Sequence, residues 1–283
     1  MEYVLKVNRL NKEYSNFKLE NVSFSIKQGS IMGFIGRNGA GKTTTLKALM
    51  NLVRPSSGEI ELLSMSLREH EKEIKQRVGY ATGGISYYKR KKLIDIINIT
   101  KIFYRNWDDE VCRHYLKMFA LDKSKKLFEL SEGMKVKFNL TIALSHHAEL
   151  LILDEPTSGL DPVSRDELLE IFLDLAKEGV SILFSTHIIS DLDRCADTIT
   201  YIRKGKILAS EKIDEFLENY SLIDLPDKGI ISDNQKGKFL GVCLNKNGST
   251  ALVRRNDEGF FKEFKKREPD LESIMIHLEK EGF

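Results

Sequence analysis

The sequence predicts an α/β fold with a mixed sheet, a helical insertion and a small α+β extension at the C-terminus. The first observation is a short apolar run, 31–35, followed by a glycine-rich loop and a segment with helical spacing. The second is a pair of apolar runs, 150–153 and 180–184, which are typical of buried parallel strands. The third is a change of composition over 85–147 and again past residue 222.

The composition is that of an ordinary globular chain, with 41% apolar and 30% charged residues. The 44 Lys and Arg residues nearly balance the 42 Asp and Glu residues, so we expect no nucleic-acid partner, which would need concentrated positive charge. The three cysteines lack metal-ligand spacing and are expected to be reduced thiols of a cytosolic protein. We expect no signal peptide, and no apolar run approaches the roughly 20 residues of a membrane helix.

The strongest motif is a glycine-rich loop that fits the pattern G-x-x-x-x-G-K-T between a predicted strand and a predicted helix. Glycines lack Cβ atoms, so backbone N–H groups can converge on phosphate oxygens, and the helix N-terminus adds its positive dipole end. Lys42 can reach the terminal phosphates of a nucleoside triphosphate, and the Thr43 hydroxyl can ligate Mg²⁺. A chance glycine-rich turn would need none of these neighbours. The expected phosphate-binding residues are Gly36, Arg37, Asn38, Gly39, Ala40, Gly41, Lys42, Thr43 and Thr44.

Two strands are predicted before this loop, at 3–7 and 22–26. Tyr14 lies in the loop between them and could stack as an exposed ring on an adenine. The alternative is a tyrosine that packs on the sheet. After the phosphate loop, apolar residues with a 3, 4, 7 spacing predict an amphipathic helix from Lys42 to about Leu52.

Short strands are predicted at 59–63 and 77–81, before the chain changes character over 85–147. This stretch is rich in Lys and aromatic residues with helical periodicity, and we interpret it as a helical insertion. Its basic run, Lys89–Lys92, is either a solvated face or a surface on which a partner docks.

The apolar run at 150–153 continues into two carboxylates, Asp154 and Glu155. In open α/β sheets, ligands bind at the carboxyl ends of the strands. Asp154 is placed to hold Mg²⁺, directly or through water. Glu155 can orient or deprotonate a water that attacks a γ-phosphate. Because adjacent residues of a strand point to opposite faces, we expect one acid to serve the metal and the other the water.

The next apolar strand, at 180–185, ends at Thr186 and His187. The His187 imidazole could hydrogen-bond a γ-phosphate, although a lone histidine at a strand end is more often structural. The remaining predicted elements here are a helix that Asp161 and Pro162 open and Gly179 ends, a helix at 191–195, and strands at 198–203 and 206–209.

We expect a main domain at 1–221 and a small α+β domain at 222–283. A linker is predicted at 224–229. The small domain should contain a hairpin of strands 239–244 and 250–254, and a final helix that starts near Asp270.

The segment Leu130–Met134, with the sequence Leu-Ser-Glu-Gly-Met, opens a helix shortly before the acidic strand. With it, residues 2–221 resemble the nucleotide-binding subunit of an ATP-binding cassette (ABC) transporter. The resemblance implies a P-loop NTPase core of the ABC ATPase type that binds ATP and Mg²⁺. The motifs that carry it are Walker A (Gly36–Thr44), the signature (Leu130–Met134), Walker B (Leu150–Asp154, then Glu155), the D-loop (Ser158–Asp161), the His-loop (Thr186 and His187) and Tyr14 as the aromatic A-loop residue.

The resemblance also implies that two cassettes, identical or different, pair head to tail and sandwich ATP between them. Ser131 and the Gly133 N–H would then hydrogen-bond the γ-phosphate of the ATP that the other subunit binds. Closure driven by ATP would move an integral membrane subunit, and hydrolysis, with Glu155 and His187 as catalytic residues, would reopen the pair. The chain would be cytoplasmic and peripheral, held on the inner face of the cell membrane by that partner.

Two positions depart from the family pattern. The signature has Glu-Gly-Met where Gly-Gly-Gln is common, but Ser131 and Gly133 remain. Gly83 stands where the Q-loop usually presents a Gln, so a contact to the Mg²⁺ site is expected to be missing or to come from Thr82.

The C-terminal extension resembles that of some bacterial export cassettes, including exporters of antimicrobial or amphipathic peptides. Alternatively, it only stabilises a dimer. For the whole chain, the alternatives are a weakly hydrolytic regulatory cassette and a soluble ABC ATPase with no role in transport.

Overall fold

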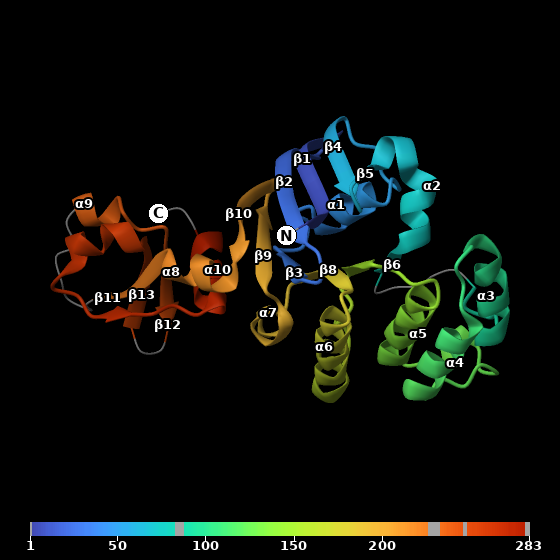
Figure 1. Ribbon diagram of the computed structural model, residues 1–283. Coiled ribbons are helices and arrows are strands. Elements are labelled where there is room, and N and C mark those ends of the chain that lie inside the picture. Colours follow the sequence, from blue (N-terminus) through green and yellow to red (C-terminus); the bar gives the residue numbers. More distant parts are fainter. Residues whose placement is uncertain (1, 83–87, 226–232, 246–247, 281–283) are drawn as a thin grey trace. The chain divides into compact units, whose positions relative to one another are not determined.

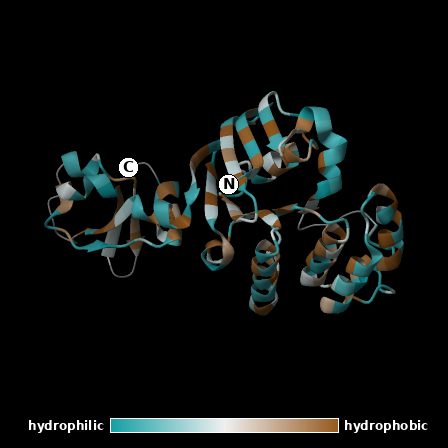
Figure 2. Ribbon diagram, in the orientation of Figure 1, coloured by the Kyte–Doolittle hydropathy of each residue, from teal (hydrophilic) through white to brown (hydrophobic). Residues whose placement is uncertain are grey.

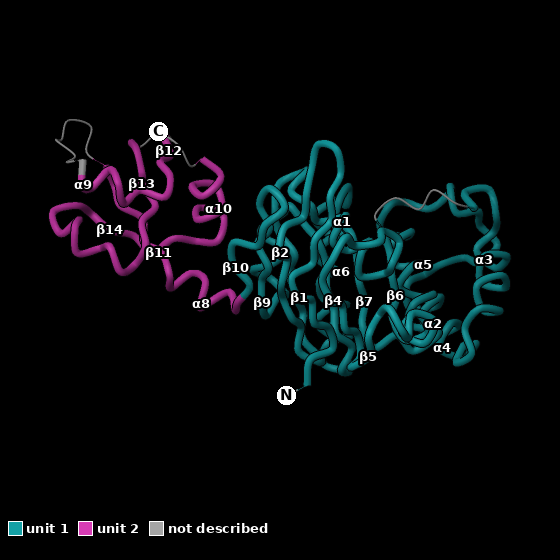
Figure 3. The backbone as a smooth tube through the Cα atoms, turned by 90° about the horizontal axis from the view of Figure 1, so that it is seen from above, with its two compact units in different colours: residues 1–210 teal, residues 211–283 magenta. Residues whose placement is uncertain are grey.

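The computed structural model describes residues 2–82, 88–225, 233–245 and 248–280 (Figure 1). It divides into two compact units, Met1–Ser210 and Glu211–Phe283 (Figure 3). This division falls earlier than the boundary expected after residue 221. The reason is that β11 (Tyr220–Leu225) pairs along its length with β13 (Gly248–Arg254), and that α8 (Ile213–Glu218) contacts β11 and α10 (Leu271–Glu279), so that both elements belong to the second unit.

The smaller sheet of the first unit is antiparallel, with the strand order β2-β1-β4-β5. β1 is longer than the predicted strand at 3–7. Two register shifts near Leu10 break the alternation of buried and exposed residues, so the pattern did not reveal the rest of the strand. β2 likewise begins before the predicted strand at 22–26. The strands are β1 (Tyr3–Tyr14), β2 (Phe17–Lys27), β4 (Ser57–Leu62) and β5 (Met65–Ser66).

The larger sheet has the order β10-β9-β3-β8-β7-β6. β3 pairs in parallel with β8 and β9, and β7 pairs in parallel with β6 and β8. Every residue of β3, β7 and β8 is buried, as the continuous apolar runs predict. The strands are β3 (Ile31–Ile35), β6 (Val78–Thr82), β7 (Leu150–Asp154), β8 (Ser181–Thr186), β9 (Thr198–Arg203) and β10 (Lys206–Lys212).

Four helices of this unit accompany its two sheets. The helix α6 alternates hydrophobic and hydrophilic residues (Figure 2) and buries one apolar face that includes Leu168 and Phe172. The sequence did not predict α2, because only Leu67 and Ile74 of its residues are buried and its apolar stripe is therefore short. The helices are α1 (Lys42–Leu49), α2 (Leu67–Arg77), α6 (Pro162–Lys177) and α7 (Ile189–Cys195).

The predicted helical insertion is confirmed over its described residues, 88–147, which contain three α-helices and no strand of the sheets. β6 and β7 flank the insertion in sequence and lie side by side in the sheet, so the chain leaves and re-enters at one edge (Figure 1). The helices are α3 (Leu93–Thr100), α4 (Asp109–Met118) and α5 (Glu132–Leu144), with short 3₁₀ turns at Lys101–Phe103 and Leu127–Glu129.

The second unit is a four-stranded sheet with the order β12-β13-β11-β14 and a core that includes Ile223, Val253 and Phe261. The predicted hairpin is confirmed by the antiparallel pair β12 and β13. The predicted linker at 224–229 begins inside β11, and its residues from 226 onward lie outside the described part. The other elements are α8 (Ile213–Glu218), α9 (Asp233–Lys236), β12 (Gly241–Asn245), a 3₁₀ helix (Arg255–Phe261), β14 (Lys266–Arg267) and α10 (Leu271–Glu279).

Within the described ranges, no helix combines the length and the apolar character that crossing a membrane requires.

Candidate functional site

The glycine-rich loop connects β3 to α1, and its backbone can form only with glycines at two positions. A Cβ atom at Gly36 would lie 2.3 Å from the carbonyl oxygen of Ile202. Gly41 has a φ of 115°, and a Cβ there would lie 2.6 Å from Leu19. The sequence pattern therefore reflects close packing of the loop as well as its suitability for phosphate.

The loop presents an exposed surface at the positive end of a helix dipole. Arg37, Asn38 and Gly39 are exposed, as is Thr43 in the first turn of α1, whereas Ala40 is buried and Thr44 is half-buried. No acidic residue lies in that first turn. An anion that approaches the loop thus meets the N-terminal end of α1 and its positive dipole.

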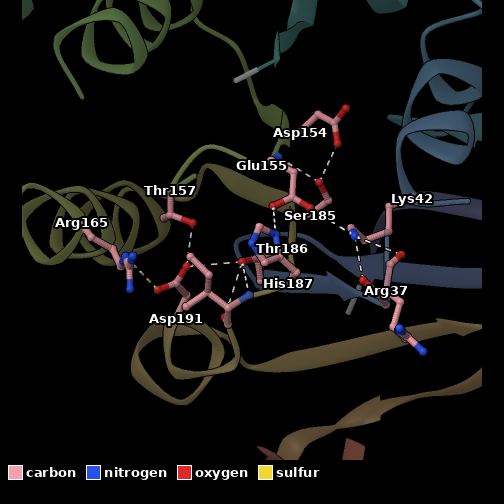
Figure 4. A network of polar contacts seen from close by, with 12 residues as sticks. Arg37, Lys42, Asp154, Glu155, Thr157, Arg165, Ser185, Thr186, His187 and Asp191 are labelled. Carbon is pink, nitrogen blue, oxygen red and sulfur yellow. Dashed lines mark hydrogen bonds and ion pairs between the residues drawn. The ribbon is translucent and has the colours of Figure 1, made fainter. Parts of the chain in front are cut away.

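The Lys42 side chain is buried and lies against the loop (Figure 4). Its Nζ donates a hydrogen bond of 2.7 Å to the Gly36 carbonyl oxygen. The same Nζ lies 3.2 Å from Oε1 of Glu155, which follows β7. Lys42 is therefore the cation that joins the phosphate loop to the end of the acidic strand.

One serine of the neighbouring strand, Ser185, holds the Asp154 carboxylate and the Glu155 backbone. Ser185 Oγ donates a 2.7 Å hydrogen bond to Oδ1 of Asp154 and accepts a 2.9 Å hydrogen bond from the Glu155 N–H. The structure corrects one expectation here. β7 ends at Asp154, and Glu155 has a φ of 53°, so strand alternation does not set the directions of the two acids. The sequence analysis missed Ser185, because nothing in its local pattern marks it.

His187 lies beyond the end of β8 and contacts the other oxygen of the Glu155 carboxylate. The distance from its Nδ1 to Oε2 of Glu155 is 2.7 Å, and 47% of the imidazole side chain is exposed. The predicted catalytic pair, Glu155 and His187, is thus brought together with Lys42 at the carboxyl edge of the parallel sheet (Figure 4).

The residues expected to hold Mg²⁺ fit that ion in chemistry. Asp154, a residue that is 7% exposed, supplies a carboxylate, and the exposed residue Thr43 supplies a hydroxyl. Mg²⁺ is usually bound through one or two protein oxygens together with water and phosphate oxygens. Within the described ranges, no cluster of three or more His, Cys, Asp or Glu side chains is found that could hold a metal ion.

Tyr14 lies at the end of β1 rather than in a loop, and its ring is 43% exposed. Its register partner is Phe17, whose ring would lie 2.9 Å from a Cβ atom on Gly41. Tyr14 therefore belongs to the end of the hairpin that packs on the phosphate loop. The degree of exposure favours the stacking interpretation over the one in which the ring packs on the sheet.

The signature segment, Leu130–Met134, lies at the start of α5 in the helical insertion. Ser131 is exposed and caps α5, where its Oγ accepts a hydrogen bond of 3.2 Å from the Met134 N–H. A Cβ atom on Gly133 would lie 3.5 Å from Leu160 and 3.6 Å from Ser164, so this turn borders the D-loop and the start of α6. Gly83, the position of the Q-loop departure, lies outside the described residues.

Comparisons with known proteins agree with this geometry. Residues 19–158 match the family model described as ABC transporter. The bacitracin transport ATP-binding protein BcrA of Bacillus licheniformis is 38% identical over 222 residues, which cover 76% of this chain and 71% of BcrA. The ABC transporter ATP-binding protein YtrB of Bacillus subtilis is 29% identical over 224 residues, or 78% of this chain and 76% of YtrB.

Solved structures agree as well. The ATP-binding subunit of an ABC transporter superposes with a TM-score of 0.68 at 29% identity, covering 75% of this chain and 91% of that one. An ATP-binding cassette in its ADP conformation superposes with a TM-score of 0.67 at 21% identity, over 76% of this chain and 93% of that one, which bears on the fold alone. The phosphate loop, the acidic strand and these relatives together lead to one conclusion: this chain belongs to the ATP-binding subunits of the ABC transporter family.

Proposed function

We propose that this subunit hydrolyses ATP, with Glu155 as the general base and His187 as its partner at the γ-phosphate. The observation that carries the proposal is the Glu155 carboxylate, which lies 3.2 Å from Lys42 Nζ and 2.7 Å from His187 Nδ1. One acid therefore lies beside a cation suited to phosphate oxygens and an imidazole whose Nδ1 contacts the acid itself. A base for phosphoryl transfer to water needs such surroundings.

In this mechanism, Glu155 accepts a proton from a water whose oxygen attacks the γ-phosphorus. The bond between the γ-phosphorus and the bridging oxygen breaks, and ADP leaves with the bond electrons. Lys42 and the loop N–H groups offset the negative charge that develops on the phosphates. Bound Mg²⁺, held by the Thr43 hydroxyl and the Asp154 carboxylate, would neutralise further phosphate charge.

The position of the signature segment supports a head-to-tail pair of cassettes. Ser131 is exposed at the N-terminus of α5, where the first turn of a helix offers N–H groups to an anion. Gly133 borders Leu160 and Ser164, and no described contact joins it to the phosphate loop of its own chain. In the proposed dimer, this anion site completes the ATP site of the partner subunit, and Tyr14 stacks on the adenine.

We further propose that the dimer drives an integral membrane subunit and that the chain lies on the cytoplasmic face of that subunit. Two of the similar proteins are named bacitracin transport ATP-binding proteins, from Bacillus licheniformis and Enterococcus faecalis. These names support a transport role with an antimicrobial or amphipathic peptide as the cargo of the partner subunit, and we infer export as its direction. The second compact unit is proposed to be the extension typical of such export cassettes.

The test is a comparison of the wild-type chain with Glu155→Gln. We expect wild-type turnover that requires Mg²⁺, and a loss of at least about 100-fold in the variant, the scale of general base catalysis. The variant should instead accumulate as an ATP-bound dimer in gel filtration. Glu178→Gln, which removes an exposed acid at the end of α6, is the matched control and should keep wild-type turnover.

Other outcomes would favour other functions. Slow wild-type turnover that Gly83→Gln raises would support the weakly hydrolytic regulatory cassette. A fully active chain that does not co-purify with any integral membrane protein would support an ABC ATPase without a role in transport. Equal turnover in wild type and Glu155→Gln would overturn the assignment of the base.

A further inference from the structure

Asp191 on α7 is a buried acid that the proposed reaction does not use. Its side chain is 1% exposed. Its Oδ2 accepts a 2.7 Å hydrogen bond from Thr157 Oγ1 and a 3.4 Å hydrogen bond from Thr186 Oγ1 (Figure 4). One carboxylate oxygen is thus shared by two hydroxyls from different segments.

The two threonines belong to the segments that carry the catalytic pair. Thr157 follows Glu155 by two residues, and Thr186 directly precedes His187. Both threonines are completely buried, so their positions are fixed by packing as well as by the shared hydrogen bonds. Thr186 Oγ1 also accepts a 2.9 Å hydrogen bond from the Ile188 N–H, which closes the turn around His187.

We propose that Asp191 is a positioning residue that sets the distance between Glu155 and His187. Its Oδ2 accepts hydrogen bonds from the segment after Glu155 and from the segment before His187. These bonds fix the two segments so that His187 Nδ1 lies 2.7 Å from Glu155 Oε2. The inference rests on the proposed function, in which these two residues act together. It adds a buried residue that acts on the catalytic pair through Thr157 and Thr186.

The surroundings of the second carboxylate oxygen of Asp191 argue against a residue that serves only the stability of the fold. Oδ1 is buried without a hydrogen bond in the described part of the chain, and so is Nε of Arg165, which lies 3.9 Å away on α6. Burying an ion pair whose partners do not hydrogen-bond each other is unfavourable, and an apolar side chain would fill such a position better. A charged Asp191 is useful if its first oxygen must bind two hydroxyls strongly.

Arg165 also connects this acid to the D-loop. It lies in the first turns of α6, which begins directly after the D-loop residues Ser158–Asp161. Burial raises the pKa of Asp191, and the Arg165 charge that faces the carboxylate offsets part of that effect. The described contacts thus link the D-loop helix, the segment after Glu155 and the segment before His187 through a single side chain.

The experiment removes each hydroxyl without removing the acid. Thr157→Val and Thr186→Val keep the shape of the side chain, and Thr157→Ser and Thr186→Ser restore the hydroxyl. We expect the double Val variant to lose about tenfold in kcat, with the Kd for ATP unchanged within about twofold, because the hydroxyls act on the geometry of the catalytic pair. The Ser variants should recover most of the lost kcat.

A double-mutant cycle separates positioning from general destabilisation. In a His187→Ala background, the double Val substitution should change kcat by less than about twofold, since the contact that it disturbs is already absent. A further tenfold loss in that background would overturn the proposal, as would wild-type kcat in the double Val variant.

A second measurement does not depend on turnover. The ring nitrogens of His187 report its tautomer by ¹⁵N nuclear magnetic resonance, and His187→Ala identifies their signals. We expect the hydrogen-bonded Nδ1–H form in the wild type and a mixture of tautomers in the double Val variant. An unchanged tautomer would overturn the proposal. If the wild type has no ATPase activity that requires Glu155, the proposed function fails, whereas the tautomer measurement still decides whether Asp191 positions His187.

Discussion

Lys42 Nζ lies 3.2 Å from Oε1 of Glu155, so an ion pair joins the phosphate loop to the segment that follows the acidic strand. The lysine side chain is 6% exposed and the glutamate side chain 22% exposed, so water screens this pair only in part. A γ-phosphate would approach the same ammonium. In the proposed reaction, the carboxylate and the phosphate would therefore compete for the charge of Lys42.

The first prediction follows from this competition. Glu155→Gln removes the competing charge while keeping the shape of the side chain, so the Kd for ATP should fall about threefold to tenfold, or about 1 kcal/mol. Fluorescence titration with ATP and with ADP would measure it, and the effect should be larger for ATP because only ATP has a γ-phosphate. An unchanged Kd, or the same shift in the Glu178→Gln control, would contradict the competition.

The second prediction concerns the head-to-tail site. Gly133→Asp should leave the fold intact, because its Cβ would meet only ordinary contacts at 3.5 and 3.6 Å and because an acid suits the first turn of α5. Its carboxylate should nevertheless repel ATP held by the other subunit. Lys42→Ala should lose ATP binding in its own loop. Each variant alone should therefore be inactive.

Mixing the two variants should restore activity. A dimer of one Lys42→Ala and one Gly133→Asp subunit has one composite site in which both halves are intact, so an equal mixture should recover roughly a quarter of wild-type ATPase activity. The control mixes Lys42→Ala with a chain that carries both substitutions, which offers no intact site. A mixture as inactive as this control would speak against composite sites.

The fold could be predicted from local signals and the site only in part. The continuous apolar runs predict β3, β7 and β8, and Asp161 with Pro162 predicts the start of α6. α2 could not be predicted because it has few buried residues, and the full length of β1 was hidden by its register shifts. In the site, the glycine-rich loop predicts Lys42, the acidic strand end predicts Asp154 and Glu155, and the end of the next strand predicts His187.

The contacts among these residues depend on strand register, which local sequence does not contain. Ser185 bonds Asp154 because β7 and β8 pair in parallel with these two residues opposite each other. Asp191 joins Thr157 and Thr186 only after α7 has packed beside those segments. Neither residue lies in a pattern that distinguishes it from an ordinary strand serine or helix aspartate.

The third prediction tests the stacking residue with a matched control on the same strand. Tyr14 and Tyr3 are both exposed, at 43% and 37%, and each has a lysine ammonium near its ring, at 5.3 and 5.7 Å. Tyr14→Ala should raise the Kd for ATP about fivefold or more, since stacking on a base contributes about 1–3 kcal/mol. Tyr3→Ala should leave the Kd unchanged, and Tyr14→Trp should preserve it. Equal effects of the two Ala variants would exclude a stacking role.

The fourth prediction concerns a buried histidine in the helical insertion. His146 is 2% exposed, its ring stacks on Tyr104 at a centroid distance of 3.8 Å, and its Nδ1 lies 3.1 Å from the Gln76 carbonyl oxygen. Burial lowers the pKa of His146 from 6.5 to about 4. The folded state therefore resists protonation that the unfolded state accepts, so this histidine stabilises the fold above pH 6.5 and that contribution is lost as the pH falls from 6.5 towards 4.

Integrated between pH 7 and pH 5, this difference corresponds to about 2 kcal/mol of unfolding free energy. His146→Phe keeps a ring against Tyr104 but cannot be protonated. Between pH 7 and pH 5, the unfolding free energy of this variant should therefore fall by about 2 kcal/mol less than that of the wild type. Urea unfolding at the two pH values would measure the difference. His114→Phe, at an exposed histidine of α4, should keep the wild-type pH dependence. If the unfolding free energies of His146→Phe and the wild type fall by the same amount between pH 7 and pH 5, protonation of His146 does not contribute to the loss of stability in acid.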